Sequence, residues 1–274
     1  MSIIILSSDS LEKGKEIAQK TCTVLDYGLV DRGLLSVIES RCEVPRDKLE
    51  WALDELPSSR GRAADLQRQA LGYIQATTLG ELLKDNLVCY GLAAHLYVLG
   101  VSHALRVRIL ADPKELIEEI SLLEKVSMEK ARDLMARRRK LRQDWSLTLY
   151  GQDETDPSQY DLVISLSQID TEEAVKIISQ TVDYRRFAPM TYSINCLKDA
   201  ELSSRVHACL RDKFPSVKVR ADGGTVVVET KGSRRNKLKT AATIKEVVQP
   251  MEGVDYVEVH VLNKLFKKAP ARSI

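Results

Sequence analysis

The 274-residue chain has no long apolar run, few aromatic residues and no paired cysteine motif. No stretch approaches the ~18 apolar residues that a membrane-spanning helix needs. The apolar run Ile3–Leu6 stops at two serines and lacks both the basic start and the roughly 7–15-residue core of a signal peptide. We therefore expect a cytoplasmic protein.

The cysteines and histidines show no ligand spacing. Without a C-x-x-C pair, the odd number of cysteines predicts reduced thiols and excludes a disulfide framework or a zinc site. The four histidines are scattered, so we expect them to be surface or packed residues and expect no metal site. These residues are Cys22, Cys42, Cys89, Cys196, Cys209, His95, His103, His207 and His260.

Charge is distributed unevenly along the chain, although the formal net charge is only +2. Residues 194–274 contain 16 basic and 9 acidic residues, whereas residues 1–193 contain 25 basic and 30 acidic residues. Single cores rarely grow much beyond ~250 residues, so the length allows one large and one small domain. The asymmetry predicts two domains with different partners.

Apolar periodicity in the first two-thirds alternates between strand and helix patterns. The β-branched run at residues 2–6 is typical of a buried parallel strand, and Asp112-Pro113 is a helix-starting pair. This alternation predicts an α/β fold with a doubly wound parallel sheet. The expected strands are 2–6, 87–90, 104–110 and 160–165, and the expected helices are 11–25, 30–38, 66–83, 128–149, 171–178 and one starting at 113.

The pattern changes around residues 185–193, where Pro189 marks an expected linker. A compact αββαβ order with its own apolar core follows: helix 199–213, strand 216–221, a turn at 222–224, strand 225–230, helix 233–248 and strand 254–262. The predicted organisation is an α/β domain at 1–188, a linker at 189–195, an α+β domain at 196–265 and a basic tail at 266–274.

The segment Ser7–Ala18 has the order strand, glycine-lysine and helix that a phosphate-binding P-loop uses. Glycines let backbone N–H groups surround the phosphates, and a lysine reaches the terminal phosphates. Gly14-Lys15 is the intact part, while Asp9 stands at the first glycine position and Glu16 at that of the magnesium-binding hydroxyl. Taken alone, this segment favours a capped helix after a strand.

Other segments, in order and at suitable spacing, resemble the cytidylate kinase-like family over about residues 1–185. The most specific is Tyr150–Ile164, in which aspartate-proline precedes tyrosine-aspartate-leucine-valine-isoleucine. The remaining matching segments are Val24–Arg32, Cys89–Ala94, Leu105–Ile109 and Ser127–Ala131. The resemblance implies a P-loop nucleoside monophosphate kinase fold, ATP with Mg as cofactors and a CMP-like acceptor.

The resemblance also implies site residues. Arg138 and Arg142, in the basic run 137–142, would form a guanidinium clamp with Lys15 as catalytic residues, although such a run is also typical of a solvated helix face. Arg32 would bind the acceptor phosphate beside Asp31. The implied nucleotide-binding residues are Lys13, Gly14, Lys15, Glu16, Asp31 and Arg32.

Several departures fall on these phosphate-facing positions. The family loop reads glycine-serine-glycine-glycine-arginine-glutamate, whereas Leu11–Glu16 retains one of its three glycines and adds the carboxylate of Glu12. Leu92 stands at a family arginine and Arg139 at a family aspartate. We therefore predict a degenerate P-loop and a nucleotide-sensing or regulatory pseudo-kinase. An active ATP-dependent kinase and a non-nucleotide adaptor are the alternatives.

Residues 196–265 resemble a BON domain in their αββαβ order, in Gly224 between two strands, and in Glu252–Val257 before the last strand. The resemblance implies a binding module, often linked to phospholipids. Basic residues near its second helix would bind an anionic partner, such as a lipid head group, a protein or a nucleic acid. A solubilising face is the alternative. These residues are Arg234, Arg235, Lys237 and Lys239, with Lys264, Lys267 and Lys268 in the tail.

Overall fold

The computed structural model describes residues 2–57 and 61–263, except for the side chains of Arg234 and Asn263. The chain divides into two compact units, Met1–Leu197 and Lys198–Ile274. The boundary falls inside helix α8 (Thr191–Arg211), which begins within the segment predicted as a linker and earlier than residue 199. The domain boundaries at 188 and 196 remain predictions. No helix in the described ranges is long and apolar enough to cross a membrane.

The first unit is built on a five-stranded, all-parallel sheet in the order β2-β3-β1-β4-β5. The predicted parallel α/β sheet is therefore confirmed. The central strand β1 pairs with β3 along one edge and with β4 along the other, and its apolar run Ile3–Leu6 is buried, as expected for a parallel sheet with helices on its faces. The strands are β1 (Ile3–Ser8), β2 (Gly28–Val30), β3 (Leu87–Tyr90), β4 (Ala104–Leu110) and β5 (Leu162–Ser165).

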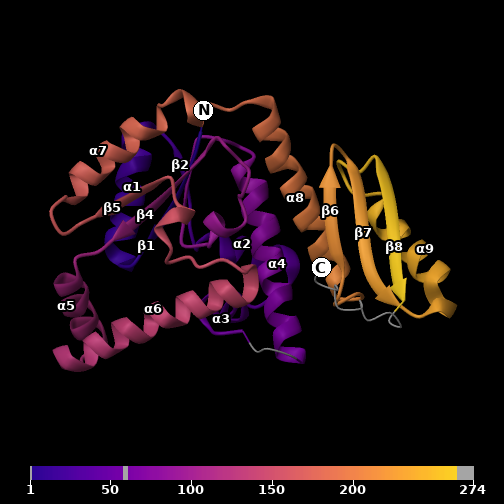
Figure 1. Cartoon of the computed structure of the whole chain (residues 1–274), viewed down its shortest axis with the longest axis horizontal. Coiled ribbons are helices and arrows are strands. Elements are labelled where there is room, and N and C mark those ends of the chain that lie inside the picture. Colours follow the sequence, from indigo (N-terminus) through magenta and orange to yellow (C-terminus); the bar gives the residue numbers. More distant parts are fainter. Residues whose placement is uncertain (1, 58–60, 264–274) are drawn as a thin grey trace, which may run out of the picture. The chain divides into compact units, whose positions relative to one another are not determined.

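Helices flank this sheet (Figure 1). Apolar side chains of α1 and α7 pack on one face, with Ile17 and Ile178 fully buried against Ile4 and Leu6 of β1. The helices α2, α3 and α4 pack against one another. The helices are α1 (Leu11–Leu25), α2 (Leu34–Cys42), α3 (Arg46–Asp54), α4 (Arg62–Leu82), α5 (Pro113–Glu124), α6 (Met128–Tyr150) and α7 (Thr171–Val182).

One expected helix in this unit is partly wrong. The helix expected at residues 30–38 starts only at Leu34, and Val30 is the last residue of the short strand β2, which was not predicted. Gly28, Leu29 and Val30 form parallel pairs with β3. Three residues are too few to show a strand periodicity, so pairing with β3 decides their conformation.

Helix starts follow the capping residues of the sequence. Asp112 accepts hydrogen bonds from the backbone N–H groups of Lys114 and Glu115 at 2.9 and 3.3 Å, and Pro113 occupies the first turn, as predicted. Asp170 forms a reciprocal capping box with Glu173 at the start of α7. These caps satisfy backbone donors that have no partner inside the helix.

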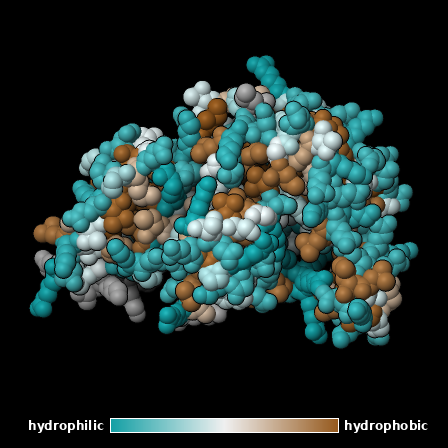
Figure 2. Space-filling model, turned by 180° about the vertical axis from the view of Figure 1, so that it is seen from behind, coloured by the Kyte–Doolittle hydropathy of each residue, from teal (hydrophilic) through white to brown (hydrophobic). Residues whose placement is uncertain are grey.

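Helices α5 and α6 form a hairpin with a small apolar cluster of its own, including Ile117, Ile120 and Ala131. The hairpin also exposes large apolar side chains, because Leu122 is 79% and Leu123 is 61% exposed. Figure 2 shows an apolar patch where this hairpin lies. The hairpin thus leaves part of its apolar surface in water.

The second unit contains a three-stranded sheet in the order β6-β7-β8. Strand β6 pairs antiparallel with β7, and β8 pairs parallel with β7 across α9. Side chains of α8 and α9 build one core on one face of the sheet, including Leu202, Val206, Ile244 and Val248. The observed elements β6 (Lys218–Asp222), β7 (Thr225–Gly232), α9 (Lys237–Val248) and β8 (Tyr256–Asn263) confirm the predicted order.

Candidate functional site

The carboxyl ends of β1 and β4 form the point where chain connections leave in opposite directions. Ligands of open α/β sheets bind at such switch points. Here Arg108 of β4 fills the position: Nη1 donates to the Ser7 hydroxyl at 2.7 Å, and Nη2 donates to the Asp9 carboxylate. The Arg108 side chain is only 12% exposed. The protein's own ion pair therefore lies where a ligand of this sheet type would be expected.

Helix α1 starts immediately after this point. Only Asp9 and Ser10 separate the end of β1 from Leu11, the first helical residue. The Ser10 hydroxyl accepts from the Lys13 backbone N–H at 3.2 Å and donates to the Glu119 carboxylate of α5 at 2.7 Å. A protein carboxylate thus lies at the helix N-terminus, where a phosphate would otherwise be favoured.

Gly14 is buried in the first turns of α1, where it packs closely against Ser8 and Tyr90. An added Cβ would lie 2.6 Å from both the Ser8 Cβ and the Tyr90 hydroxyl. Tyr90 donates to the Leu11 carbonyl at 3.0 Å, and burial raises its pKa to about 12. Because Gly14 has no side chain, the neutral Tyr90 ring can pack directly against helix α1.

The other predicted phosphate-loop residues lie along the same helix. Lys13 is half-buried, and Lys15 is exposed. Glu16 accepts from Lys20 at 2.7 Å, and Lys20 also reaches Glu172 of α7 at 2.5 Å. Residues 13–16 therefore share a helix and do not form a loop.

The predicted acceptor-side pair follows β2. Arg32 makes two hydrogen bonds with the Asp54 carboxylate at 2.5 and 2.7 Å, and its Nε donates to the Gly91 carbonyl at 3.3 Å. Asp54 raises the pKa of Arg32. Asp31 accepts from the Gly33 backbone N–H at 2.8 Å. Both residues lie near the end of the sheet, but each has a partner within the protein.

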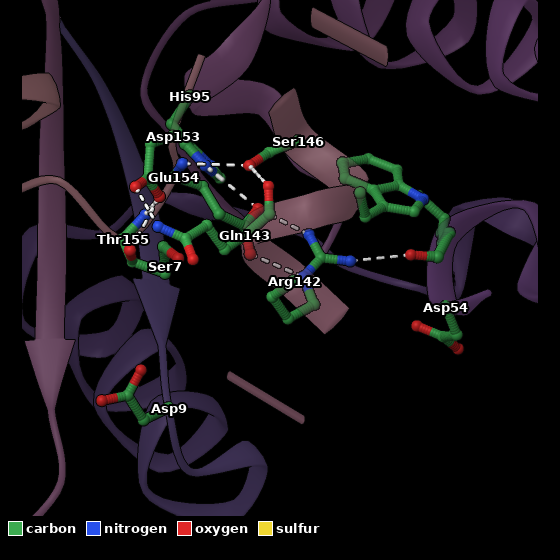
Figure 3. Close-up of polar contacts among 12 residues, drawn as sticks. Ser7, Asp9, Asp54, His95, Arg142, Gln143, Ser146, Asp153, Glu154 and Thr155 are labelled. Carbon is green, nitrogen blue, oxygen red and sulfur yellow. Dashed lines mark hydrogen bonds and ion pairs between the residues drawn. The ribbon is translucent and has the colours of Figure 1, made fainter. Parts of the chain in front are cut away.

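A second polar cluster surrounds Arg142 on α6 (Figure 3). Its Nε and Nη2 donate to the two carboxylate oxygens of Glu154 at 2.6 Å each, and Nη1 donates to the Leu53 carbonyl at 2.7 Å. The guanidinium lies 4.3 Å from the centroid of the Trp145 ring. Each of its nitrogens is thus held by a protein acceptor. Arg138, the other predicted clamp residue, pairs with Glu124 of α5.

Glu154 is the buried centre of this cluster, with its side chain 3% exposed. Burial by itself raises the pKa of this carboxyl, but the nearby His95 ring and the hydrogen bonds from Arg142 outweigh burial and lower the pKa to about 2. His95 Nε2 lies 3.6 Å from Glu154, and its ring stacks on Tyr160 with centroids 5.4 Å apart. Burial lowers the pKa of His95, which favours the neutral imidazole. The charges of this cluster thus neutralise each other, because the Arg142 cation pairs with the Glu154 anion.

The sequence prediction missed both Glu154 and His95. Glu154 lies within Tyr150–Ile164, the most specific segment of the resemblance, and that was the available signal. Its neighbour Asp153 is also acidic and accepts from Gln143 at 2.6 Å. Spacing alone does not distinguish the buried carboxylate from its more exposed neighbour.

An acidic groove lies between the start of α1 and helix α5, with a cavity volume of about 360 Å³. Glutamates outnumber its single lysine, so its electrostatic potential disfavours anions. It is lined by Ser10, Glu12, Lys13, Ala111, Glu115, Leu116, Glu118, Glu119, Leu122 and Leu123.

The predicted basic residues of the second unit lie around the start of α9. Arg235, Lys237 and Lys239 are exposed, while the side chain of Arg234 and residues 264–268 lie outside the described part. The first turn of α9 contains no acidic residue. In the described ranges, no group of three or more histidine, cysteine or acidic side chains is arranged to hold a metal ion.

Comparisons with known proteins identify a family for the first unit. The model of the cytidylate kinase-like family matches residues 3–168. An uncharacterized protein from Eubacterium ventriosum is 17% identical, with 68% of this chain and 100% of that protein covered and a TM-score of 0.49. A shikimate kinase from Bacteroides thetaiotaomicron is 15% identical, with coverages of 67% and 99% and a TM-score of 0.41. No curated protein matches this chain.

Proposed function

The chain belongs to the cytidylate kinase-like family, and we propose that it is a nucleotide kinase-like protein with a degenerate P-loop that acts as a nucleotide-sensing or regulatory pseudo-kinase. The observation that carries this proposal is the immediate start of α1 at Leu11, capped by Ser10 and its partner Glu119. This arrangement leaves Asp9 and Ser10 in place of a phosphate-binding loop.

Electrostatics at the start of α1 support the proposal. Phosphate binding uses free backbone N–H groups and positive potential at a helix N-terminus. Here the carboxylates of Asp9 and Glu119 are held at that end by Arg108 and Ser10. Two unit charges about 4 Å apart near a protein surface interact by about 4 kcal/mol. These residues do not fit the triphosphate of ATP with its magnesium ion, and an incoming phosphate would have to displace a carboxylate.

The three predicted arginines support the same proposal. Arg32, Arg138 and Arg142 are each paired with a carboxylate. Stabilising a transferred phosphoryl group requires cations directed at that group. Each arginine would first have to leave its partner, which is a reason to expect weak nucleotide binding without transfer.

Purified protein with ATP, magnesium and a panel of nucleoside monophosphates tests the proposal. We expect no phosphoryl transfer. Transfer that Lys15→Ala abolishes would refute the pseudo-kinase and favour an active CMP-like kinase. Lys20→Ala is a control for loss of a lysine on the same helix, because Lys20 pairs with glutamates on α1 and α7.

Thermal unfolding with each nucleotide separates sensing from an adaptor role. A nucleotide at about ten times its dissociation constant stabilises a protein by about 1.4 kcal/mol. We expect at least one nucleotide to raise the unfolding temperature. A flat response to every nucleotide would contradict nucleotide sensing and favour the adaptor.

For the second unit, we propose a BON-like binding module whose partner is anionic. Support comes from its αββαβ order and from the exposed Arg235, Lys237 and Lys239 at the start of α9. Cations at a helix N-terminus oppose the helix dipole, so a bound anion would relieve this repulsion. Lys237→Glu with Lys239→Glu should abolish binding of the full chain to anionic vesicles, while Lys218→Glu on β6 should not. Wild-type protein that binds neither anionic vesicles nor DNA at low salt would refute this proposal.

A further inference from the structure

Strand β8 is an edge of the sheet in the second unit. It pairs with β7 in parallel over eight positions, from Tyr256 to Asn263, and the described residues contain no strand on its other side. An edge strand presents a row of unpaired backbone N–H and C=O groups. Such a row is a template for pairing with another chain.

The two edges of this sheet differ in how they are protected. Natural edge strands are protected by short length, proline, or charged residues, especially lysine. The other edge, β6, has five residues and exposes Lys218 and Arg220. Strand β8 has eight residues and contains neither lysine nor proline. The structure therefore leaves β8 as the edge suited to pairing.

The side chains of β8 alternate cleanly between the two faces. Val257 and Val261 are buried, and Val257 belongs to the core beneath α8 and α9. Val259 packs against the same core, whereas the alternate residues Tyr256, Glu258, His260 and Leu262 are exposed on the open face, Tyr256 at 57% and Leu262 at 53%. Two large apolar side chains thus stand in water near opposite ends of one strand.

The residues of β8 are self-complementary about Val259. When two copies pair antiparallel with Val259 opposite Val259, Glu258 of each copy faces His260 of the other. The same register places Tyr256 opposite Leu262 and Val257 opposite Val261. In this register the valines of both copies lie on the same core face. A shift of the pairing by one residue would place the valines of the second copy on the open face of the first.

We propose that β8 is a homodimerisation edge, which pairs antiparallel about Val259 with β8 of a second copy of this chain. The two three-stranded sheets then form one six-stranded sheet around a two-fold axis, with the same strand contributed by each copy. The dimer covers Tyr256 and Leu262, and it adds the partner's imidazole to each Glu258, whose carboxylate lies 3.0 Å from His260 Nε2 of its own strand. This inference concerns the second unit and does not depend on nucleotide binding by the first.

Sedimentation velocity of the full chain, from low to high micromolar concentration, tests the proposal. We expect a concentration-dependent dimer. His260→Glu places carboxylates opposite each other at two symmetric positions, and we expect about tenfold weaker dimerisation. The exchange variant with Glu258→His and His260→Glu restores the opposite pairs and should recover the wild-type affinity.

Two further variants provide a second test and a control. Leu262→Lys removes the apolar pair from an exposed position and should also weaken the dimer, while circular dichroism checks that each variant is folded. Lys218→Gln lowers the charge of the open face by the same amount as His260→Glu, but on β6, and should leave the dimer unchanged. A wild-type monomer at every concentration would overturn the proposal. A dimer unaffected by both His260→Glu and Leu262→Lys, or an exchange variant without recovery, would also overturn it.

Discussion

The buried pair of Glu154 and Arg142 predicts a large and pH-dependent loss of stability when its charge is removed. Glu154→Gln keeps the shape of the side chain but removes the carboxylate that accepts two hydrogen bonds from Arg142 at 2.6 Å. The glutamine amide can accept from Arg142 through one oxygen only. The substitution therefore leaves one guanidinium donor without its partner.

The expected magnitude follows from the pKa of Glu154. The folded protein lowers this pKa from 4.5 to about 2. A tenfold change in proton affinity corresponds to about 1.4 kcal/mol, so the difference corresponds to about 3 kcal/mol of stability at neutral pH. Because the folded pKa is the lower one, this stability is present above pH 4.5 and is lost as the pH falls toward 2. Removal of one partner of a buried ion pair costs a similar amount, about 3–5 kcal/mol.

Urea unfolding followed by tryptophan fluorescence measures the effect directly, since Trp145 lies against the Arg142 guanidinium. At neutral pH we expect Glu154→Gln to lower the free energy of unfolding by about 3 kcal/mol. The difference from wild type should shrink as the pH falls below 4.5. Asp144→Asn is the control, because Asp144 pairs with Lys140 on the same helix at an exposed position. Its loss should be below about 0.5 kcal/mol.

Two results would refute the reasoning. One is Glu154→Gln with wild-type stability at neutral pH, which would mean that desolvation of the charged pair cancels its attraction. The other is a loss of the same size at every pH, which would assign the effect to packing and not to the charge of Glu154.

Three further predictions concern the start of the first unit, and urea unfolding measures each of them. Gly14→Ala should cost about 1–3 kcal/mol, because the added Cβ meets Ser8 and Tyr90 at 2.6 Å. Gly80→Ala, whose added Cβ meets no described atom within 4 Å, should instead stabilise α4 by about 0.5–1 kcal/mol, and equal effects would contradict the packing role of Gly14. Ser10→Ala should cost about 1 kcal/mol through loss of the helix cap, whereas Ser40→Ala, within α2, should change little. Arg32→Ala should cost less than about 1 kcal/mol, because its pair with Asp54 is partly exposed; a larger loss would mean that Arg32 supports the fold beyond this pair.

The strongly patterned elements were predictable from the sequence. The buried run of β1, the helix start at Asp112-Pro113, and the αββαβ order of the second unit depend on nearby residues, and the structure confirms them. Strand β2 was not predicted, and its last residue Val30 was assigned to a helix, because three residues show no periodicity without their partner β3. The helix α3 was not predicted either, and it supplies the Asp54 that holds Arg32.

The sequence by itself determined the family over residues 3–168, and it predicted that Asp9, Glu12 and Leu92 stand at positions that face phosphates in that family. It also showed that Gly14 and Lys15 follow a buried strand. Only the tertiary structure decided what these residues touch. The partners of Ser10, Asp9 and Arg142 are Glu119, Arg108 and Glu154, and the first two come from elements about a hundred positions away. Capping is local and can be read from neighbouring residues, but the pairing of charges across elements is established only when the sheet and its helices pack.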